Sequence, residues 1–373
     1  MAKKTLFKFN KSLIMPQYIT HNFADFNFKF NNVKKFNDNK IKTELLKKYS
    51  LENLVILFNG EIIYNTVKKT DYNLTNDAKN IVIQKHKNRI SENIALSSNI
   101  SNLNSVLFLN SINSAKEINV IISGNIDINH YSYYLLDKNC YNKINVKFEL
   151  FNNAKINYFS NVEIKENSEL LLTYKNIIKN CNVFGLEAGI YNNAKLLLNN
   201  INLAGADNII YINIDLLETS ASAKLNNVTV IKNDCKNGNN ITINHLNKQT
   251  SGIINFVGII GDNSSLNVEA LSIIEKGYRQ SNACQNIKAI TLTDNANVIT
   301  NPQLIINEYD VSAKHKTTVG QIDTEQLYYL MSRGIAKNKA VELLIMANIN
   351  EIASNVIDIK TKNEILKFLK SVI

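Results

Sequence analysis

The chain has 373 residues, enough for two or three domains, and 45% of them are hydrophobic, so it can bury a sizeable core. It has only 12 glycines and 2 prolines, where average usage would give about 26 and 19; this argues against glycine-rich phosphate loops and disordered linkers. A net charge of +10 would suit nucleic acid or an anionic membrane. The lysines are scattered rather than gathered in a stripe, however, so we expect neither partner.

The N-terminal segment mixes aromatic and lysine-rich stretches. Residues 41–49 have a helical pattern, and residues 53–58 (N-L-V-I-L-F) are typical of a buried strand. Asn59-Gly60 is a strong hairpin signal, which predicts a return strand over 62–64. We expect this segment to form a small cap or subdomain.

The middle of the chain alternates short β-rich runs, such as 106–109 and 228–230, with polar turns. No run is followed by an amphipathic helix, which argues against a βαβ sheet. A phrase of a polar residue, Ala or Ser, a polar residue and an aliphatic residue recurs at irregular intervals, at 153–156, 167–170, 193–196, 222–225 and 295–298.

This texture predicts a parallel β-helix, in which each coil stacks its backbone on the next. Asparagine would replace the scarce glycine at left-handed corners and could stack in hydrogen-bonded ladders. An antiparallel sandwich is the alternative, because short strands at regular spacing look similar.

The end of the chain has a helical pattern. Asp323 is a good N-cap and Gln326 completes a capping box, while Gly334 stands where a helix ends. A second helix is predicted over 338–348, and a third begins with Thr361 as its cap. These helices could cap the open end of the solenoid or dock a partner.

We therefore expect a mainly β chain in three parts. Residues 1–95 form a mixed N-terminal region, 96–320 the β-helix core and 321–373 a helical domain. The N-terminus shows no secretory signal and no stretch approaches a membrane span, so a cytoplasmic protein is expected.

Catalytic signatures are missing: we find no Walker-type phosphate loop, dinucleotide fingerprint, nucleophile elbow or H-E-x-x-H, so we expect a chain that is not an enzyme. No flavin motif is recognised either. The histidines lie far apart in sequence, and a structural role is expected for three of them, His21, His86 and His130.

The cysteines form no CxxC pair, and their scatter suits a reducing compartment. A structural role is expected for each of the four, Cys140, Cys181, Cys235 and Cys284. Cys284 lies in a polar setting and is the one of the four at which we would expect an exposed thiol.

The segment 294–334 carries the most specific pattern in the chain. It contains N-P-Q-L-I-I at 301–306, D-V at 310–311, His315, T-T-V-G-Q-I-D at 317–323 and E-Q-L-Y-Y-L-M-S-R-G at 325–334. In order, spacing and length this string resembles the C-terminal signature of the SufB/SufD family, and the stretch 317–323 follows the SufD form.

The resemblance implies a right-handed parallel β-helix with a flanking N-terminal region and a C-terminal helical domain. It also implies a scaffold subunit of the SUF iron–sulfur cluster assembly complex, which supports de novo cluster assembly and iron acquisition. Such a subunit pairs with a SufB-like subunit through the β-helices and binds a SufC-like ATPase through its helices; in isolation it could form a homodimer. It would hold no stably bound cofactor alone, but a transient iron–sulfur cluster could form at the SufB interface.

His315 matches the family histidine at that interface, where a neutral imidazole could ligate iron. Its neighbours Lys314 and Lys316 depart from the family, and two cations beside a metal site would oppose it electrostatically. The residues expected to bind the SufC-like ATPase come from the same signature and the helix after it: Gln326, Leu327, Tyr328, Tyr329, Leu330, Ser332, Arg333, Gly334, Ile335, Ala340 and Leu344.

Two other classes of protein remain. A carbohydrate-active β-helix enzyme would need clustered carboxylates and a secreted context, whereas the acidic residues here are dispersed. A non-catalytic structural or adhesive β-helix would also lack catalytic residues, but it would not need the terminal helices. Binding of a small ATPase would separate this alternative from the assembly scaffold.

Overall fold

The computed structural model describes residues 12–14, 20–22, 39–49, 52–67, 72–75, 105–111, 116–151, 153–178, 180, 182–353 and 359–370. The strands of the first half are β1 (Ser12–Ile14), β2 (Thr20–Asn22), β3 (Leu54–Phe58), β4 (Glu61–Asn65), β5 (Tyr72–Thr75), β6 (Ser105–Ser111), β7 (Lys116–Gly124), β8 (Ile128–Leu136), β9 (Tyr141–Leu150), β10 (Ile156–Ile164), β11 (Glu169–Ile178) and β12 (Asn182–Ile190). Those of the second half are β13 (Lys195–Ala204), β14 (Asn208–Leu216), β15 (Ser222–Ile231), β16 (Lys236–His245), β17 (Ser251–Ile260), β18 (Ser265–Ile274), β19 (Asn282–Thr291), β20 (Asn297–Ile306) and β21 (Ser312–Gln321). The helices are α1 (Asn39–Lys48), α4 (Thr324–Ser332), α5 (Lys337–Ala353) and α6 (Ile359–Leu369).

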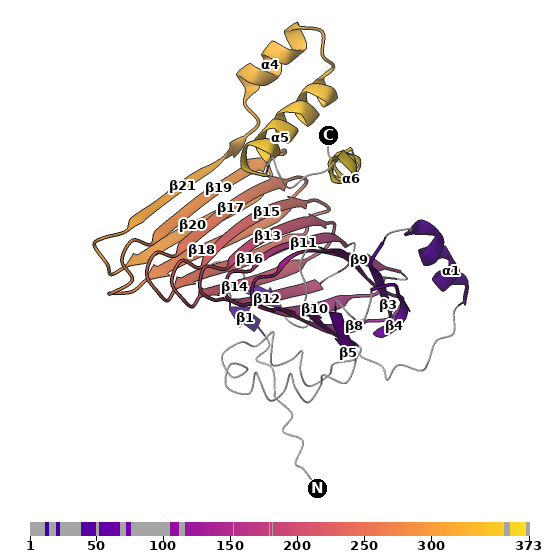
Figure 1. Cartoon of the computed structure of the whole chain (residues 1–373). Coiled ribbons are helices and arrows are strands. Elements are labelled where there is room, and N and C mark those ends of the chain that lie inside the picture. The colour runs from indigo at the N-terminus through magenta and orange to yellow at the C-terminus, as the bar shows by residue number, and fades with distance from the viewer. Residues whose placement is uncertain are drawn as a thin grey trace.

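The strands from β6 to β21 form a parallel β-helix, so the antiparallel sandwich is wrong (Figure 1). Odd-numbered strands from β7 onward build a ten-stranded sheet together with β3 and β4, and even-numbered strands from β6 onward build a nine-stranded sheet together with β5. Each coil adds one strand to each sheet, and every strand from β7 to β19 bonds to the strands before and after it in its sheet. Paired positions lie 26 residues apart at Asn182 and Asn208 (208 − 182) but 32 apart at Leu266 and Val298 (298 − 266).

One corner of the β-helix uses a left-handed residue in coil after coil. Each residue at this corner is the second residue before a strand of the ten-stranded sheet. The backbone angle φ is between 57° and 59° at Asn139, Asn167, Ser220, Gln249 and Gln280, and 51° at Asn193. A left-handed conformation costs other side chains more than it costs asparagine or glycine. Asparagine therefore does replace glycine at the corners, as predicted, although three coils use other residues.

A ladder of side-chain amides runs along the outer face of the ten-stranded sheet. Asn226 Nδ2 donates to Asn199 Oδ1 at 3.0 Å, Asn255 Nδ2 to Asn226 Oδ1 at 2.9 Å, and Asn286 Nδ2 to Asn255 Oδ1 at 2.9 Å. The ladder begins at Thr173 in β11, whose Oγ1 accepts from Asn199 Nδ2 at 3.4 Å. The predicted asparagine ladder is thus confirmed, and it ties the coils together across five strands.

The N-terminal region is continuous with the β-helix at β3. This strand pairs in parallel with β7, and β4 returns antiparallel to it through Asn59 (φ 49°) and Gly60 (φ 92°). The predicted hairpin is confirmed, but its first strand extends the ten-stranded sheet. Leu45 and Tyr49, in and directly after α1, pack with the outer face of β3 and so cover the sheet at this point.

The C-terminal helices cover a face of the β-helix and leave its last coil open. Val341 and Ile345 of α5 and Ile365 of α6 share one buried cluster with Val228 and Val257 on the outer face of the ten-stranded sheet. Of the two expectations for these helices, capping of the open end is therefore wrong. No helix within the described ranges combines the length and the apolar character needed to cross a membrane.

Two helix boundaries differ from those predicted. The second helix, α5, continues to Ala353 rather than ending near residue 348. The third, α6, begins at Ile359, so Thr361 lies inside it and is not its cap. Thr361 is buried, and Lys175 Nζ on the sheet donates to its hydroxyl, which shows that this threonine serves the packing of α6 on the β-helix.

The lumen of the β-helix holds two buried histidines. Nδ1 of His130 lies 2.6 Å from Ser105 Oγ and its Nε2 lies 2.7 Å from Ser132 Oγ, and the ring stacks on Tyr158. Burial lowers the pKa of His130 to about 3. His245 lies further along the lumen with Nδ1 2.8 Å from Thr250 Oγ1, and burial lowers its pKa to about 4. The predicted structural role of His130 agrees with these contacts.

Removing the side chain at one left-handed corner should stabilise the protein. Ser220→Gly relieves the cost of a left-handed β-carbon and is expected to raise the free energy of unfolding by about 1 kcal/mol. The matched control Ser222→Gly, in β15, should lower it by about 0.5–1 kcal/mol, because glycine loses more entropy in a strand. Urea unfolding of both variants measures whether each change raises or lowers the free energy of unfolding. A loss of stability in Ser220→Gly would contradict a left-handed backbone at this residue.

Acid should destabilise the β-helix through its lumen histidines. The folded pKa of His130 lies below the unfolded value near 6.5, so the unfolded chain binds the extra proton as pH falls from 6.5 toward 3. In that window the free energy of unfolding should fall by about 1.4 kcal/mol per pH unit for this one group. In the variant His130→Gln, the free energy of unfolding measured between pH 4 and 6 is expected to depend on pH less steeply, by about 1.4 kcal/mol per pH unit. The same pH dependence as in the unchanged protein would contradict this account.

Candidate functional site

The final coil of the β-helix is uncovered. Strand β20 ends the nine-stranded sheet and β21 ends the ten-stranded sheet, and no described strand lies beyond either of them. Every residue of β21 is exposed, and β20 contains none that is fully buried. In Figure 1 these two strands form the outermost edge of the β-helix, away from β3 and α1. This end therefore presents two open strand edges and the interior of a coil.

The register places His315 on the interior side of this last coil. Ile287 and Ala289 of β19 belong to the lumen core, whereas Ile290 belongs to the cluster on the outer face. Side chains alternate along a strand, so Gln285 also faces the lumen, and its partner in β21 is His315. The histidine is exposed because no further coil covers it.

The same alternation separates His315 from its two lysine neighbours. Lys314 and Lys316 pair with Cys284 and Asn286, which alternate with the lumen residues and so lie on the outer face of the sheet. Both lysines therefore point away from a cation held by His315, and the expectation that they oppose such a cation stays a prediction.

Exposed apolar side chains gather at this end of the molecule. Ile305, Tyr309 and Val319 belong to the last coil and the turn within it, and Val319 is 46% exposed. Four more lie on the helices that follow: Tyr328, Tyr329, Met331 and Leu343. Among the described residues, just two other large apolar side chains are exposed, Tyr141 and Leu246. A concentration of exposed apolar side chains is typical of surfaces through which proteins bind one another.

Helix α4 stands away from the β-helix, as Figure 1 shows. Its start is fixed by Asp323, whose Oδ1 accepts from the main-chain N–H groups of Glu325 at 2.9 Å and Gln326 at 3.3 Å. Its end is fixed by Gly334, which has φ 83° and donates to the carbonyl of Met331. No residue of α4 is buried. Leu327 packs toward α5 and the outer face of the sheet, whereas the side of α4 that carries Tyr328 and Tyr329 is exposed.

The residues predicted to bind an ATPase fall into three groups. Most are exposed, on α4 or directly after it: Gln326, Tyr328, Tyr329, Ser332, Arg333 and Gly334. Leu327, Leu330, Ile335 and Leu344 are half-buried. Ala340 is fully buried, which places it in the packing of α5 rather than on an open surface. Arg333 lies over the ring of Tyr329, 5.3 Å from its centroid, so the two side chains present one joined patch.

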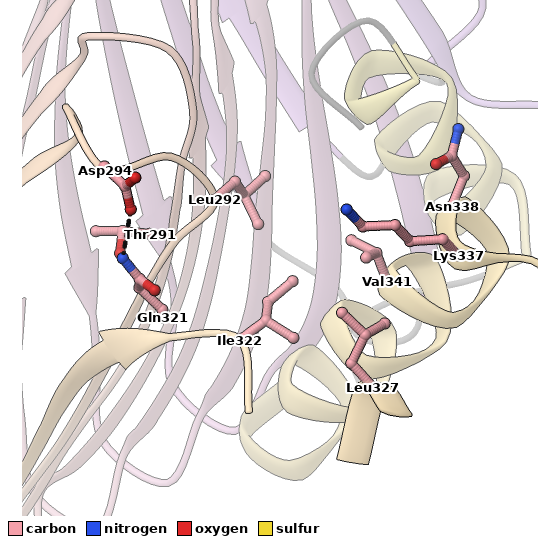
Figure 2. A pocket seen from close by; sticks show the side chains of 9 residues that line it. All are labelled: Thr291, Leu292, Asp294, Gln321, Ile322, Leu327, Lys337, Asn338 and Val341. Atoms are coloured by element: carbon pink, nitrogen blue, oxygen red, sulfur yellow. Dashed lines mark hydrogen bonds between the residues drawn. The ribbon is translucent and has the colours of Figure 1, made fainter. Parts of the chain in front are cut away.

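A pocket of about 330 Å³ lies at the N-terminal end of α4, between the last coils and the start of α5 (Figure 2). Its apolar wall is formed by Leu292, Ile322, Leu327 and Val341. The polar part includes Asp294 and Gln321, and Lys337 and Asn338 of α5 also line it. Gln321 Nε2 donates to Asp294 Oδ1 at 2.9 Å, which links the end of β21 to the turn before β20.

The described cysteines are all buried. Cys140, Cys235 and Cys284 are free thiols with little exposure. The expectation that Cys284 is exposed is wrong: it is 7% exposed, because it lies between Ile253 and Lys314 in the ladder of the outer face. Burial raises the pKa of Cys235 to about 11, which keeps that thiol protonated at neutral pH and unreactive.

The remaining sequence candidates do not join His315. His130 and His245 are buried in the lumen. His86 and Cys181 lie outside the described residues, and of His21 only the backbone, in β2, is described. Within the described part of the chain no three His, Cys, Asp or Glu side chains come together as a metal site. His315 therefore offers one imidazole at the open end, outside any group of three such side chains among the described residues.

The sequence analysis missed the apolar residues of the last coil, Ile305, Tyr309 and Val319. The signal was present at Val319, an apolar residue in an otherwise polar run. An apolar residue in such a run indicates an exposed apolar surface only if its strand, here β21, lies at the end of the sheet.

The chain was compared with known proteins. The family model for the "SUF system FeS cluster assembly, SufBD core domain" matches residues 153–348. The iron–sulfur cluster assembly protein SufD of Bacillus subtilis (strain 168) is 41% identical over 101 residues, 27% of this chain and 23% of that protein. SufD of Escherichia coli (strain K12) is 42% identical over 71 residues, 19% of this chain and 17% of that protein. A SufBD family protein of Mycobacterium leprae is 28% identical over 109 residues, 29% of this chain and 12% of that protein.

The aligned segments thus span less than a quarter of each of these relatives. The family model, in contrast, covers more than half of this chain, including β10 to β21, α4 and most of α5. This chain belongs to the SufB/SufD family of the SUF system of iron–sulfur cluster assembly, and within that family it is SufD-like.

Proposed function

We propose that this chain is a non-catalytic scaffold subunit of a SUF complex, which pairs with a SufB-like subunit through the last coil of its β-helix and binds a SufC-like ATPase through α4. The observation that carries the proposal is the uncovered last coil, whose two open strand edges and exposed apolar side chains lie beside the SufD-type signature. Unpaired strand edges readily accept another strand.

Pairing through this end has a simple physical basis. A second β-helix that approaches the open end would supply hydrogen-bond partners to the outer edge of β21 and β20, and it would bury Val319 and Ile305. The same surface could bind a second copy of this chain when no other partner is present. His315 would then lie inside the interface, where a nascent cluster, the cargo of the complex, could be ligated by groups from both subunits.

The proposed ATPase-binding surface consists of α4 and the pocket at its N-terminal end. Tyr328 and Tyr329 of α4 are 75% and 57% exposed, and tyrosines are frequent anchors of protein interfaces. The pocket beside Leu327 could receive an apolar side chain of the partner. ATP-driven movement of the ATPase would reach the last coil by a short path, because Ile322 and Asp323 join β21 directly to α4.

The first test is co-expression with a SufB-like subunit and a SufC-like ATPase, followed by size-exclusion chromatography with mass detection. The proposal predicts one complex that contains all three chains. If this chain elutes apart from both partners, an isolated structural β-helix becomes the better account.

The aromatic surface of α4 is tested by Tyr328→Ala combined with Tyr329→Ala. Loss of two exposed aromatic anchors should weaken ATPase binding by about tenfold or more while pairing with the SufB-like subunit is retained. Tyr141→Ala, which removes an exposed tyrosine from β9, should leave ATPase binding unchanged. Equal binding by the double variant and the control, measured by titration calorimetry, would place the ATPase elsewhere.

The open end is tested by Val319→Glu. A buried unpaired carboxylate in the interface should weaken pairing with the SufB-like subunit by about tenfold or more. Leu246→Glu makes the same change at an exposed leucine directly after β16, two strands before the last coil in the nine-stranded sheet, and is expected to pair normally. Normal pairing of Val319→Glu would show that the last coil is not the interface.

The role of His315 is tested by His315→Ala in the assembled complex. Because His315 is exposed at the open end, the variant should assemble normally, yet cluster formation, followed by absorbance in the visible range, should fall sharply. Intact cluster formation would mean that His315 is not a ligand.

A further inference from the structure

Gln285, a lumen residue of β19, has an unusual set of contacts. It is fully buried, and its side chain reaches from the ten-stranded sheet to the opposite sheet. Its Nε2 donates to Ser272 Oγ of β18 at 2.9 Å and to the main-chain oxygen of Gln303 of β20 at 3.0 Å. Both N–H groups of the amide are thus used, and they anchor it beneath the last coil.

The orientation of this amide is fixed by chemistry. The main-chain oxygen of Gln303 can only accept a hydrogen bond, so the nitrogen of the amide must face it. The other end, Oε1, is buried and has no hydrogen-bond partner in the part of the chain that the structure describes. A buried acceptor without a donor is rare in folded proteins and calls for a specific explanation.

The neighbours of Gln285 along the sheet suggest the donor. Its partner in β17 is Ile254, which offers none, and its partner in β21 is His315. Both side chains face the interior of the coil, and adjacent strands lie roughly 4.8 Å apart. An imidazole N–H is a hydrogen-bond donor, and Lys314 and Lys316 lie on the opposite face of the strand.

The hydrogen bond to His315 is not formed in this structure, where Oε1 has no partner and the His315 side chain is exposed at the open end. We propose that rotation of this exposed side chain forms it and that Gln285 is a positioning residue for His315: its Oε1 accepts the N–H of the imidazole and so fixes the tautomer and the direction of the ring. The lone pair of the second ring nitrogen then points outward, at the open end of the β-helix. A histidine that ligates a metal commonly donates its other N–H to a fixed acceptor, which orients the ring. The use of this arrangement for cluster ligation rests on the proposed function, whereas the contact itself does not.

The contact can be tested on the full chain alone, without metal or partners. The protein is labelled with ¹⁵N-histidine and studied by two-bond ¹H–¹⁵N correlation at pH 9, above the ordinary range of imidazole pKa values. His315→Asn identifies the signals of His315. In Gln285→Leu the ratio of the two His315 tautomers should change by about fivefold or more, as expected for the loss of one hydrogen bond.

The matched control Ser272→Ala removes one hydrogen-bond partner of the Gln285 N–H groups but keeps Oε1 and the bond to Gln303, so it should retain the original tautomer. The signals of His130 and His245, which lie in earlier coils, report on the fold and should not move. Should Gln285→Leu fail to fold, Gln285→Met, which is unbranched and lacks the acceptor, decides by the same signals. An unchanged tautomer ratio in the Leu or Met variant, or the same change in Ser272→Ala, would overturn the proposal.

The outcome is separable from that of the proposed function. If the tautomer depends on Gln285 but His315→Ala leaves cluster formation intact, the contact stands and the ligand role fails. If both hold, Gln285→Leu in the assembled complex should lower iron affinity by about 10- to 100-fold, as is typical for the loss of an outer-shell partner.

Discussion

Each coil of this protein is completed by the next one, and the whole structure depends on that constraint. A strand inside the β-helix has hydrogen-bonded neighbours on both sides, and its inward side chains are covered by the coils before and after it. In the last coil, β20 and β21 each have a hydrogen-bonded neighbour on one side, and no described strand lies on the other. The chain does not cover this end with its terminal helices: α5 and α6 lie on the outer face of the ten-stranded sheet, and α4 projects from it. The proposed pairing with a second subunit would supply the neighbours that this end lacks among the described strands.

The same constraint gives the functional residues their setting. The alternation of side chains puts His315 toward the interior and its lysine neighbours toward the exterior, although the three are consecutive in sequence. It also brings Gln285 directly beneath His315, across 30 residues of chain (315 − 285). The short link from β21 to α4 connects the coil that holds His315 to the helix that exposes Tyr328 and Tyr329. Cluster chemistry and ATPase binding could thus be coupled over a few residues.

Much of the fold could be predicted from sequence, since local chemistry determines it. The turn at Asn59-Gly60, the cap at Asp323 and the glycine at 334 act through their own backbone, and each is found where it was expected. The asparagine corners follow from the same reasoning. The site was less accessible, because it depends on which coil is last. Cys284 has polar neighbours in sequence yet is buried between neighbours in the ladder, and Thr361 has the form of a cap yet lies within a helix. These positions required the register and the packing of α6, which no local pattern contains.

The measurement that tests the central claim most directly is hydrogen–deuterium exchange of the main chain, with and without a SufB-like subunit. In the isolated chain, the amides of β21 that point away from β19 should exchange rapidly, because no strand accepts their hydrogen bonds. On pairing, exchange in β20 and β21 should slow strongly, while exchange in β3 and β4 at the other end of the sheet should stay the same. Unchanged exchange in the last coil of a complex that has formed would contradict the account, since the open end would then not be the surface through which this subunit assembles.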